Sequence, residues 1–399
     1  MELFNGEKFI NKKSEIEKAQ NDNDDKINKK YDSGEVRIVT EQARYPLPTL
    51  KDMFSDNKYN LHPDFQRRRR WSQEKKSKLI ESFIINVPVP PVFLYEIDYA
   101  NFEVMDGLQR ITTIIDFYKD LYVLEGLEEW KELNGKKYSE LPIRIKEGID
   151  RRYLSSIILL KESAKDDVEA DRLKKIVFER LNSGGVKLTA QETRNALYDG
   201  KLNKLCLKLS ENSIFKRLWN INDDVMLENN DEDYYEIDNN KLYRDMSDVE
   251  LVLRFFAFRH INEYTGRLDS FLDNFLRAGN NFSEKVLEDY EKLFNKNIAL
   301  VYKLFGENSF RQYKEFRKKY RWSEPTRTVY DPMMMALTDY KEADFDFENT
   351  TEEQRVELLG RLYEEKIDKF DGKRQGKNEI NERMQIIKEF LDSLVKKGE

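Results

Sequence analysis

A short polar stretch between residues 104 and 113 has the residue types of an anion-binding turn. An alternating apolar segment precedes it and a segment of helical period follows, so a strand would deliver Asp106 to the start of a helix. The first turn of a helix offers unpaired N–H groups, and an arginine adds a planar fork for phosphate. The candidate residues are Asp106, Gly107, Gln109, Arg110, Thr112 and Thr113. Spacing alone is equally compatible with an ordinary capped helix that carries a surface arginine.

Three further arginines stand beside predicted helix starts or turns, each near an amide side chain. The pairs are Gln66 with Arg67, Arg180 with Asn182, and Arg194 with Asn195. Separated arginines suit a polyphosphate because each guanidinium neutralises charge in its own direction. We expect these residues to line the same pocket as Asp106. The alternative is that Arg180 and Arg194 are structural ion-pair partners, Arg194 with Glu192.

Basic residues near position 70 are candidate contacts for nucleic acid. The run Arg67–Arg70 is followed by Trp71 and several lysines, and arginine next to an aromatic ring suits phosphate contact and base stacking. The candidate DNA-binding residues are Arg68, Arg69, Arg70 and Lys75. A solvated helix start of mixed charge is the competing interpretation.

A second basic stretch, RQYKEFRKKYR, runs from Arg311 to Arg321. It interleaves arginine and lysine with tyrosine and phenylalanine, which could also serve nucleic acid. We interpret it instead as an amphipathic helix that is buried through Phe316 and Tyr320.

Periodicity predicts mixed secondary structure in the first half of the chain and helices in the second. Strands are expected at 35–40, 92–97, 102–105 and 153–160, with the middle two as a hairpin. Helices are expected from Ser72, from Gly107 and over 167–181, and a capping-box pair, Thr189 and Glu192, starts another. From residue 247 onward the pattern is helical.

The predicted fold class is therefore α+β, with an all-α part behind it. We expect a charged N-terminal arm at 1–34, an α+β domain at 35–200, a helical segment with an acidic connector at 201–245, and a helical domain at 246–399.

Composition narrows the function classes. Two histidines and one cysteine, Cys206, are too few for a histidine-rich nuclease or a cysteine zinc site. The net charge of −7 does not indicate a nucleic-acid binder in bulk, so DNA contact would depend on local basic clusters. The N-terminal sequence lacks an apolar signal core and no stretch is long enough to span a bilayer, so we expect a cytoplasmic protein.

The stretch VMDGLQRITTIIDFY resembles the signature of the domain-of-unknown-function 262 family, Asp-Gly-Gln-Gln-Arg followed by Leu-Thr-Thr, with Leu108 in place of the first glutamine. Three further blocks occur in the family's order. The first is PDFQR before Trp71, and the second is PVPPVFL at 88–94. The third is FERLNSGGV at 178–186, followed by Gln191-Glu192 and Arg194-Asn195-Ala196. The family includes the N-terminal part of GmrSD-type modification-dependent restriction endonucleases.

This resemblance implies a core similar to ParB and sulfiredoxin that binds a nucleoside triphosphate with Mg²⁺ at the Asp106–Arg110 turn. It makes Asp106, Gln109 and Arg110 the catalytic candidates. It also implies DNA and a separate nuclease or defence protein as partners, while self-association stays open.

The leading hypothesis is an NTP-binding and NTP-hydrolysing sensor of a prokaryotic restriction-type or anti-phage DNA defence system. One alternative is a metal-dependent nuclease that nicks DNA through Asp106 and other carboxylates. Another is a non-catalytic DNA-binding adaptor for a partner nuclease. Nucleotide turnover separates the first hypothesis from the adaptor, and nicking of DNA without a partner would favour the nuclease.

Overall fold

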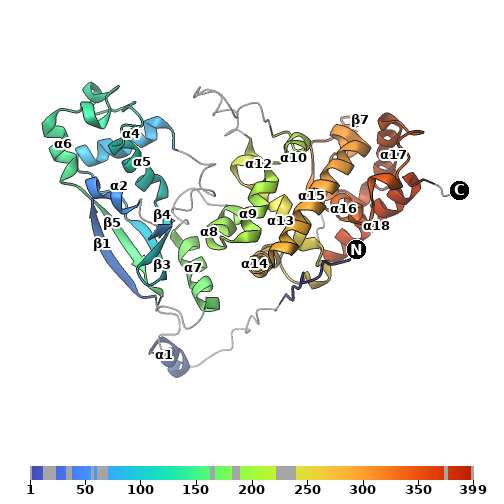
Figure 1. The fold of residues 1–399 in the computed structure, drawn as a ribbon, viewed down its shortest axis with the longest axis horizontal. Helices are drawn as coiled ribbons and strands as arrows, with labels where there is room; N and C mark the ends of the chain where they lie inside the picture. The colour runs from blue at the N-terminus through green and yellow to red at the C-terminus, as the bar shows by residue number, and fades with distance from the viewer. Residues whose placement is uncertain are drawn as a thin grey trace. The chain divides into compact units, whose positions relative to one another are not determined.

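The chain forms two compact units, an α+β unit at residues 16–188 and a helical unit that combines residues 1–15 with 189–399 (Figure 1). The predicted α+β class is thereby confirmed, and the part predicted to be all-α is largely helical. The computed structural model describes residues 2–11, 24–32, 38–54, 58–60, 71–161, 167–181, 189–221, 240–372 and 376–396.

A five-stranded mixed sheet of order β1-β5-β3-β4-β2 is the frame of the α+β unit. Its strands are β1 (Thr40–Pro46), β2 (Tyr59–Asn60), β3 (Val92–Asp98), β4 (Asn101–Asp106) and β5 (Tyr153–Leu159). The predicted β3–β4 hairpin is confirmed, and β5 lies parallel to β3. The predicted strand at 35–40 is wrong in its bounds, because pairing with β5 begins only at Thr40; residues 35–37 lie outside the described residues.

One face of this sheet carries the core of the unit. The helices around that core are α2 (Leu50–Met53), α4 (Gln73–Ile84), α5 (Leu108–Tyr118) and α6 (Ile143–Asp150). Ile80 of α4 and Ile111 and Ile114 of α5 pack with Val92 and Leu94 of β3, and each is almost fully buried. Burial of one such side chain stabilises a fold by roughly 1.5–3 kcal/mol, so this packing fixes where α5 starts relative to the sheet.

Helix α7 (Asp167–Leu181) has the bounds that the sequence predicts and contacts β4. Leu94 of β3 pairs with Val104 of β4, and both side chains face the core. Because side chains alternate along a strand, the next pair, Tyr95 and Glu103, lies on the other face of the sheet. Lys174 of α7 forms an ion pair with Glu103, and its ammonium lies 5.5 Å from the ring centre of Tyr95. Helix α7 therefore packs on the sheet face away from the core.

The helical unit contains most of the helices that the sequence predicts after residue 189. They are α8 (Ala190–Leu197), α9 (Lys201–Ser210), α10 (Ser213–Leu218), α12 (Lys241–Arg244), α13 (Ser247–Phe258), α14 (Leu268–Gly279), α15 (Glu284–Phe305), α16 (Arg327–Ala336), α17 (Glu352–Glu365) and α18 (Lys377–Leu394). The capping box of α8 is confirmed, with Thr189 and Glu192 each bonded to the other's backbone N–H. None of the described helices combines the length and apolar composition needed to cross a lipid bilayer.

The predicted helix at 311–321 is wrong. This stretch forms a hairpin of β6 (Tyr313–Phe316) and β7 (Lys319–Trp322), in which Phe316 and Tyr320 are about half exposed. Tyr313 and Trp322 are directly paired across the hairpin, so they share one face and pack over Gly360 of α17. Packing of these two rings is incompatible with the helical period, and the unit is therefore not all-α.

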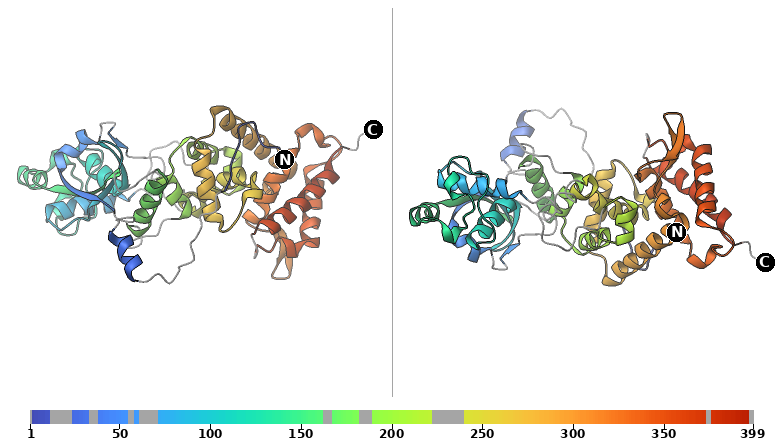
Figure 2. Two further views of the ribbon diagram at one scale, coloured as in Figure 1. Left: turned by 90° about the horizontal axis from the view of Figure 1, so that it is seen from below. Right: turned by 90° about the horizontal axis from the view of Figure 1, so that it is seen from above.

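Residues 2–11, at the start of the predicted arm, run along the helical unit (Figure 2). The Glu7 carboxylate is buried and accepts hydrogen bonds from Arg259 Nε and Nη2 and from Tyr290 Oη, all at 2.8 Å. His260 Nε2 lies 3.1 Å from the same carboxylate. Burial by itself raises the pKa of Glu7, but Arg259 and His260 outweigh it and hold this pKa at about 2. The N-terminal segment is thus held by a buried, ionised carboxylate.

Replacement of Glu7 by Gln is expected to destabilise the helical unit by roughly 3 kcal/mol at pH 7, given a pKa lowered from 4.5 to about 2. Because the folded-state pKa is depressed, this contribution is present above pH 4.5 and disappears as the pH falls toward 2. Urea unfolding of the wild type, Glu7→Gln and the exposed control Glu288→Gln should show a gap for Glu7→Gln alone that narrows from pH 7 to pH 3. An equal gap at both pH values would contradict the assignment.

Candidate functional site

Gly107 joins strand β4 directly to helix α5, as the sequence predicts. Its φ of +98° lies in the left-handed region, which glycine adopts without steric penalty. A Cβ at this position would come within 2.4 Å of Val92 Cγ1, so no other residue fits here without movement of β3. The junction places Asp106 at the last position of β4 and gives α5 a start that no side chain caps.

Arg110 and Asp106 form an ion pair beside this start. Arg110 Nη2 donates to Asp106 Oδ2 at 2.7 Å and to the carbonyl oxygen of Pro91 at 3.3 Å. The Arg110 Nε is buried and has no hydrogen-bond partner among the described residues. The Arg110 side chain is 15% exposed and that of Asp106 is 38% exposed. The Arg110 guanidinium is therefore bonded to the end of β4 and to the segment before β3, and not all of its N–H groups are used. The Asp106 carboxylate faces solvent.

Gln109 connects this start to the segment before α4. Its Oε1 accepts a hydrogen bond from the backbone N–H of Trp71 at 3.3 Å. Lys75, a candidate DNA contact, is exposed and places its ammonium 4.8 Å from the centre of the Trp71 ring. Residues from three segments of the sequence thus meet here: Trp71, Pro91 and the Asp106–Arg110 turn.

The two threonines of the turn point their hydroxyl groups into the helix or the core. Thr112 Oγ1 donates to the backbone carbonyl oxygens of Leu108 and Gln109. Thr113 is fully buried, and its Oγ1 has no partner among the described residues. The Thr112 hydroxyl is thus bonded within its own helix and the Thr113 hydroxyl is buried, and direct contact with a nucleotide stays a prediction for both.

The other predicted nucleotide- and DNA-binding residues fall into three groups. Arg180 is exposed in the last turn of α7, in the same unit as Asp106. A second group lies outside the described residues: Gln66, Arg67, Arg68, Arg69, Arg70 and Asn182. Their roles toward nucleotide or DNA stay predictions.

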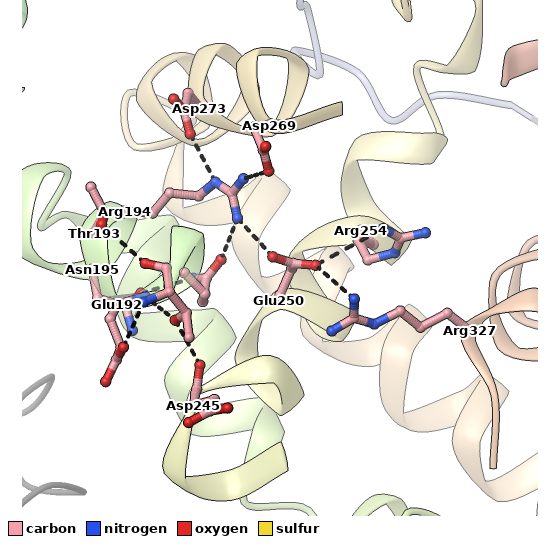
Figure 3. Close-up of polar contacts among 12 residues, drawn as sticks. Glu192, Thr193, Arg194, Asn195, Asp245, Glu250, Arg254, Asp269, Asp273 and Arg327 are labelled. Carbon is pink, nitrogen blue, oxygen red and sulfur yellow. Dashed lines mark hydrogen bonds and ion pairs between the residues drawn. The ribbon is translucent and has the colours of Figure 1, made fainter. Parts of the chain in front are cut away.

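Arg194 and Asn195 belong to the helical unit, where both side chains have protein partners (Figure 3). Arg194 is 1% exposed and its Nε donates to Asp273 at 2.8 Å, its Nη1 to Glu250 at 2.9 Å and its Nη2 to Asp269 at 3.0 Å. Asn195 Oδ1 accepts a hydrogen bond from Gln191 Nε2, and Asn195 Nδ2 donates one to Met246 Sδ. These contacts are those of a structural ion pair, the alternative raised for Arg194, although Glu192 is not among its partners.

Glu250 extends the Arg194 contacts into a chain of charged side chains, most of which are buried. Its carboxylate lies 3.6 Å from Arg327 Nη1 and 4.0 Å from Arg254 Nη1, and Arg254 in turn pairs with Asp331. This chain was not predicted from the sequence, because its members come from α8, α13, α14 and α16. One signal was present: from residue 249 onward α13 is apolar except for Glu250 and Arg254, and each charge buried in such a helix requires a partner.

Among the described residues, no cluster of three or more histidine, cysteine, aspartate or glutamate side chains is arranged to hold a metal ion. Residues 50–198 match the model of a known family, the N-terminal domain of the GmrSD restriction endonuclease. This range runs from α2 to the end of α8 and contains the Asp106–Arg110 turn. No curated protein and no solved structure gives a significant match.

Proposed function

We propose that this chain, whose residues 50–198 match the GmrSD restriction endonuclease N-terminal domain, is an NTP-binding and NTP-hydrolysing sensor in a restriction-type DNA defence system. The family match supports the restriction context, and the nucleotide role is our inference. The observation that carries it is the start of α5, where an uncapped helix, a glycine without room for a Cβ and the Arg110 guanidinium meet.

The parts of this start suit a polyphosphate chemically. The free N–H groups of the first turn and the positive end of the helix dipole favour an anion. Arg110 holds Asp106 and the Pro91 carbonyl with its Nη2, and the other terminal nitrogen of the guanidinium would donate to a phosphate. A bound Mg²⁺ would supply charge neutralisation at the phosphates, and the exposed Asp106 carboxylate is the group here that could hold it or orient water.

The remaining candidates complete the proposal. Gln109 would orient a water or a phosphate oxygen, and Arg180 would add charge from α7. Arg67 and Asn182, which match the family blocks, remain proposed nucleotide-binding residues. We propose a nuclease or another defence protein as the partner that cuts DNA.

Nucleoside triphosphates with Mg²⁺ are expected to raise the melting temperature of the full chain. A ligand at 100 times its Kd stabilises the folded state by about 2.7 kcal/mol, which for a unit of this size is a shift of roughly 5–10 °C. ATP, GTP, CTP and UTP would be compared with their nucleosides, which lack the phosphates and should produce no shift. Melting temperatures that stay flat with all four triphosphates at millimolar concentration would end the proposal.

Phosphate release separates hydrolysis from binding. The sensor proposal expects turnover that depends on Asp106, so Asp106→Asn should bind nucleotide but release little phosphate. Binding without any release by the wild type would leave a nucleotide-controlled adaptor in place of an NTPase.

A further inference from the structure

The β6–β7 hairpin carries a concentration of positive charge on a chain whose net charge is −7. Between Tyr313 and Trp322 there are five cationic side chains and one carboxylate, Glu315. The cations are Lys314, Arg317, Lys318, Lys319 and Arg321. All five are exposed, and none forms an ion pair with a carboxylate among the described residues.

The strand register sorts the hairpin into two different faces. Tyr313 pairs with Trp322 and Lys314 with Arg321, and side chains alternate along each strand. One face therefore bears Tyr313, Glu315, Tyr320 and Trp322, and the other bears Lys314, Phe316, Lys319 and Arg321. The second face has three cations and no acidic group, and we call it the basic face.

Aromatic contacts fix the first face to the helical unit. Tyr313 lies next to Gly360 of α17, and Trp322 makes an edge contact with the buried ring of Tyr363. Figure 1 shows β7 beside α17. The hairpin is therefore anchored on one side, and its basic face is left toward solvent.

The turn of the hairpin is strained in a way that adds charge. Arg317 and Lys318 have φ values of +51° and +64°, the pattern of a type I′ turn, which normally carries Asn-Gly. A left-handed conformation costs a non-glycine residue roughly 1–2 kcal/mol. Two long cations thus occupy positions where Asn and Gly would be more stable, and strain retained at an exposed turn points to a function.

Phe316 contacts one guanidinium group of the basic face and one of the turn. The Arg321 guanidinium lies 3.9 Å and that of Arg317 5.4 Å from the centre of the Phe316 ring, which is 45% exposed. Cation–π contacts leave the N–H groups of arginine at the rim available for an anion. The surface therefore presents preoriented phosphate donors.

We propose that the basic face and the turn of the β6–β7 hairpin bind the phosphate backbone of duplex DNA. A two-stranded ribbon has the width to enter the major groove, and uncompensated arginine and lysine on one face match a polyanion. The proposal rests on the DNA-directed part of the proposed function and is independent of the nucleotide site in the other unit.

The double variant Arg317→Asn/Lys318→Gly tests this surface without endangering the fold. It installs the preferred turn sequence, so the melting temperature should stay or rise, while two phosphate contacts are lost. Binding of the full chain to a 30-base-pair duplex would be followed by fluorescence anisotropy from 50 to 200 mM NaCl without nucleotide. We expect roughly tenfold weaker binding and a salt slope reduced by about two.

The matched control is Lys285→Asn/Lys292→Asn, which removes two exposed lysines from α15 of the same unit. It should bind DNA as the wild type does. Unchanged affinity and salt slope in the hairpin variant would overturn the proposal, and so would wild-type protein that does not bind duplex DNA. Nucleotide-induced stabilisation, measured separately on both variants, reports on the proposed function and should be unaffected.

Discussion

Replacement of Arg194 by Met is expected to destabilise the helical unit by about 3–5 kcal/mol. The guanidinium is 1% exposed and bonds three carboxylates from α13 and α14, and removal of one partner from a buried ion pair leaves uncompensated charge. In the variant Glu250 would still have Arg254 and Arg327 nearby, at 3.6–4.0 Å. Asp273, which is only 12% exposed, would lose its ion pair with Arg194 Nε. Urea unfolding followed by far-UV circular dichroism measures the effect.

The matched control for Arg194→Met is Arg361→Met. Arg361 pairs with Glu357 on the surface of α17, where both side chains are 65% exposed, and such pairs contribute little. We expect its unfolding midpoint to stay close to that of the wild type. A stable Arg194→Met variant with weakened nucleotide binding would instead assign Arg194 to the pocket, as the family blocks imply.

Replacement of Arg110 by Ala is expected to weaken nucleoside triphosphate binding by one to two orders of magnitude. The Arg110 guanidinium lies beside the uncapped start of α5, where it could donate to a phosphate. A charge-assisted hydrogen bond of this kind contributes roughly 1.5–3 kcal/mol to binding. Titration calorimetry with the triphosphate that stabilises the wild type most would give the affinity. Loss of the bonds to Asp106 and Pro91 should affect the fold little, because the Asp106 carboxylate is solvated.

Two variants make the Arg110 result specific. Arg144→Ala removes a highly exposed arginine from α6 in the same unit and should bind nucleotide normally. Arg110→Lys keeps the charge but not the planar fork, so intermediate affinity is expected. Wild-type affinity in Arg110→Ala would mean that the nucleotide, if bound, sits elsewhere.

Local patterns in the sequence were sufficient for much of the fold. The bounds of α7, the capping box of α8 and the β3–β4 hairpin depend on residues within a few positions of each other. The β4–α5 junction was also predictable, since the change of period at Gly107 marks it. These features set the geometry around Asp106 and Arg110.

Features that depend on distant partners were not predictable from one sequence. Arg194 bonds residues 56 to 79 positions away, and Glu7 reaches Arg259 across 252 positions. Periodicity contains no information on such pairs. The β6–β7 turn has no glycine or asparagine to mark it, so the surrounding aromatic and basic residues were compatible with a helix.

Hydrogen–deuterium exchange of the full chain tests most directly whether a nucleotide binds at the start of α5. The amides of residues 107–111 would be compared with and without a saturating triphosphate and Mg²⁺. Phosphate bonded to the first-turn N–H groups should slow exchange in this segment and leave α17 and α18 unchanged. Unchanged exchange at 107–111, together with nucleotide-dependent protection confined to another segment, would contradict the proposed site.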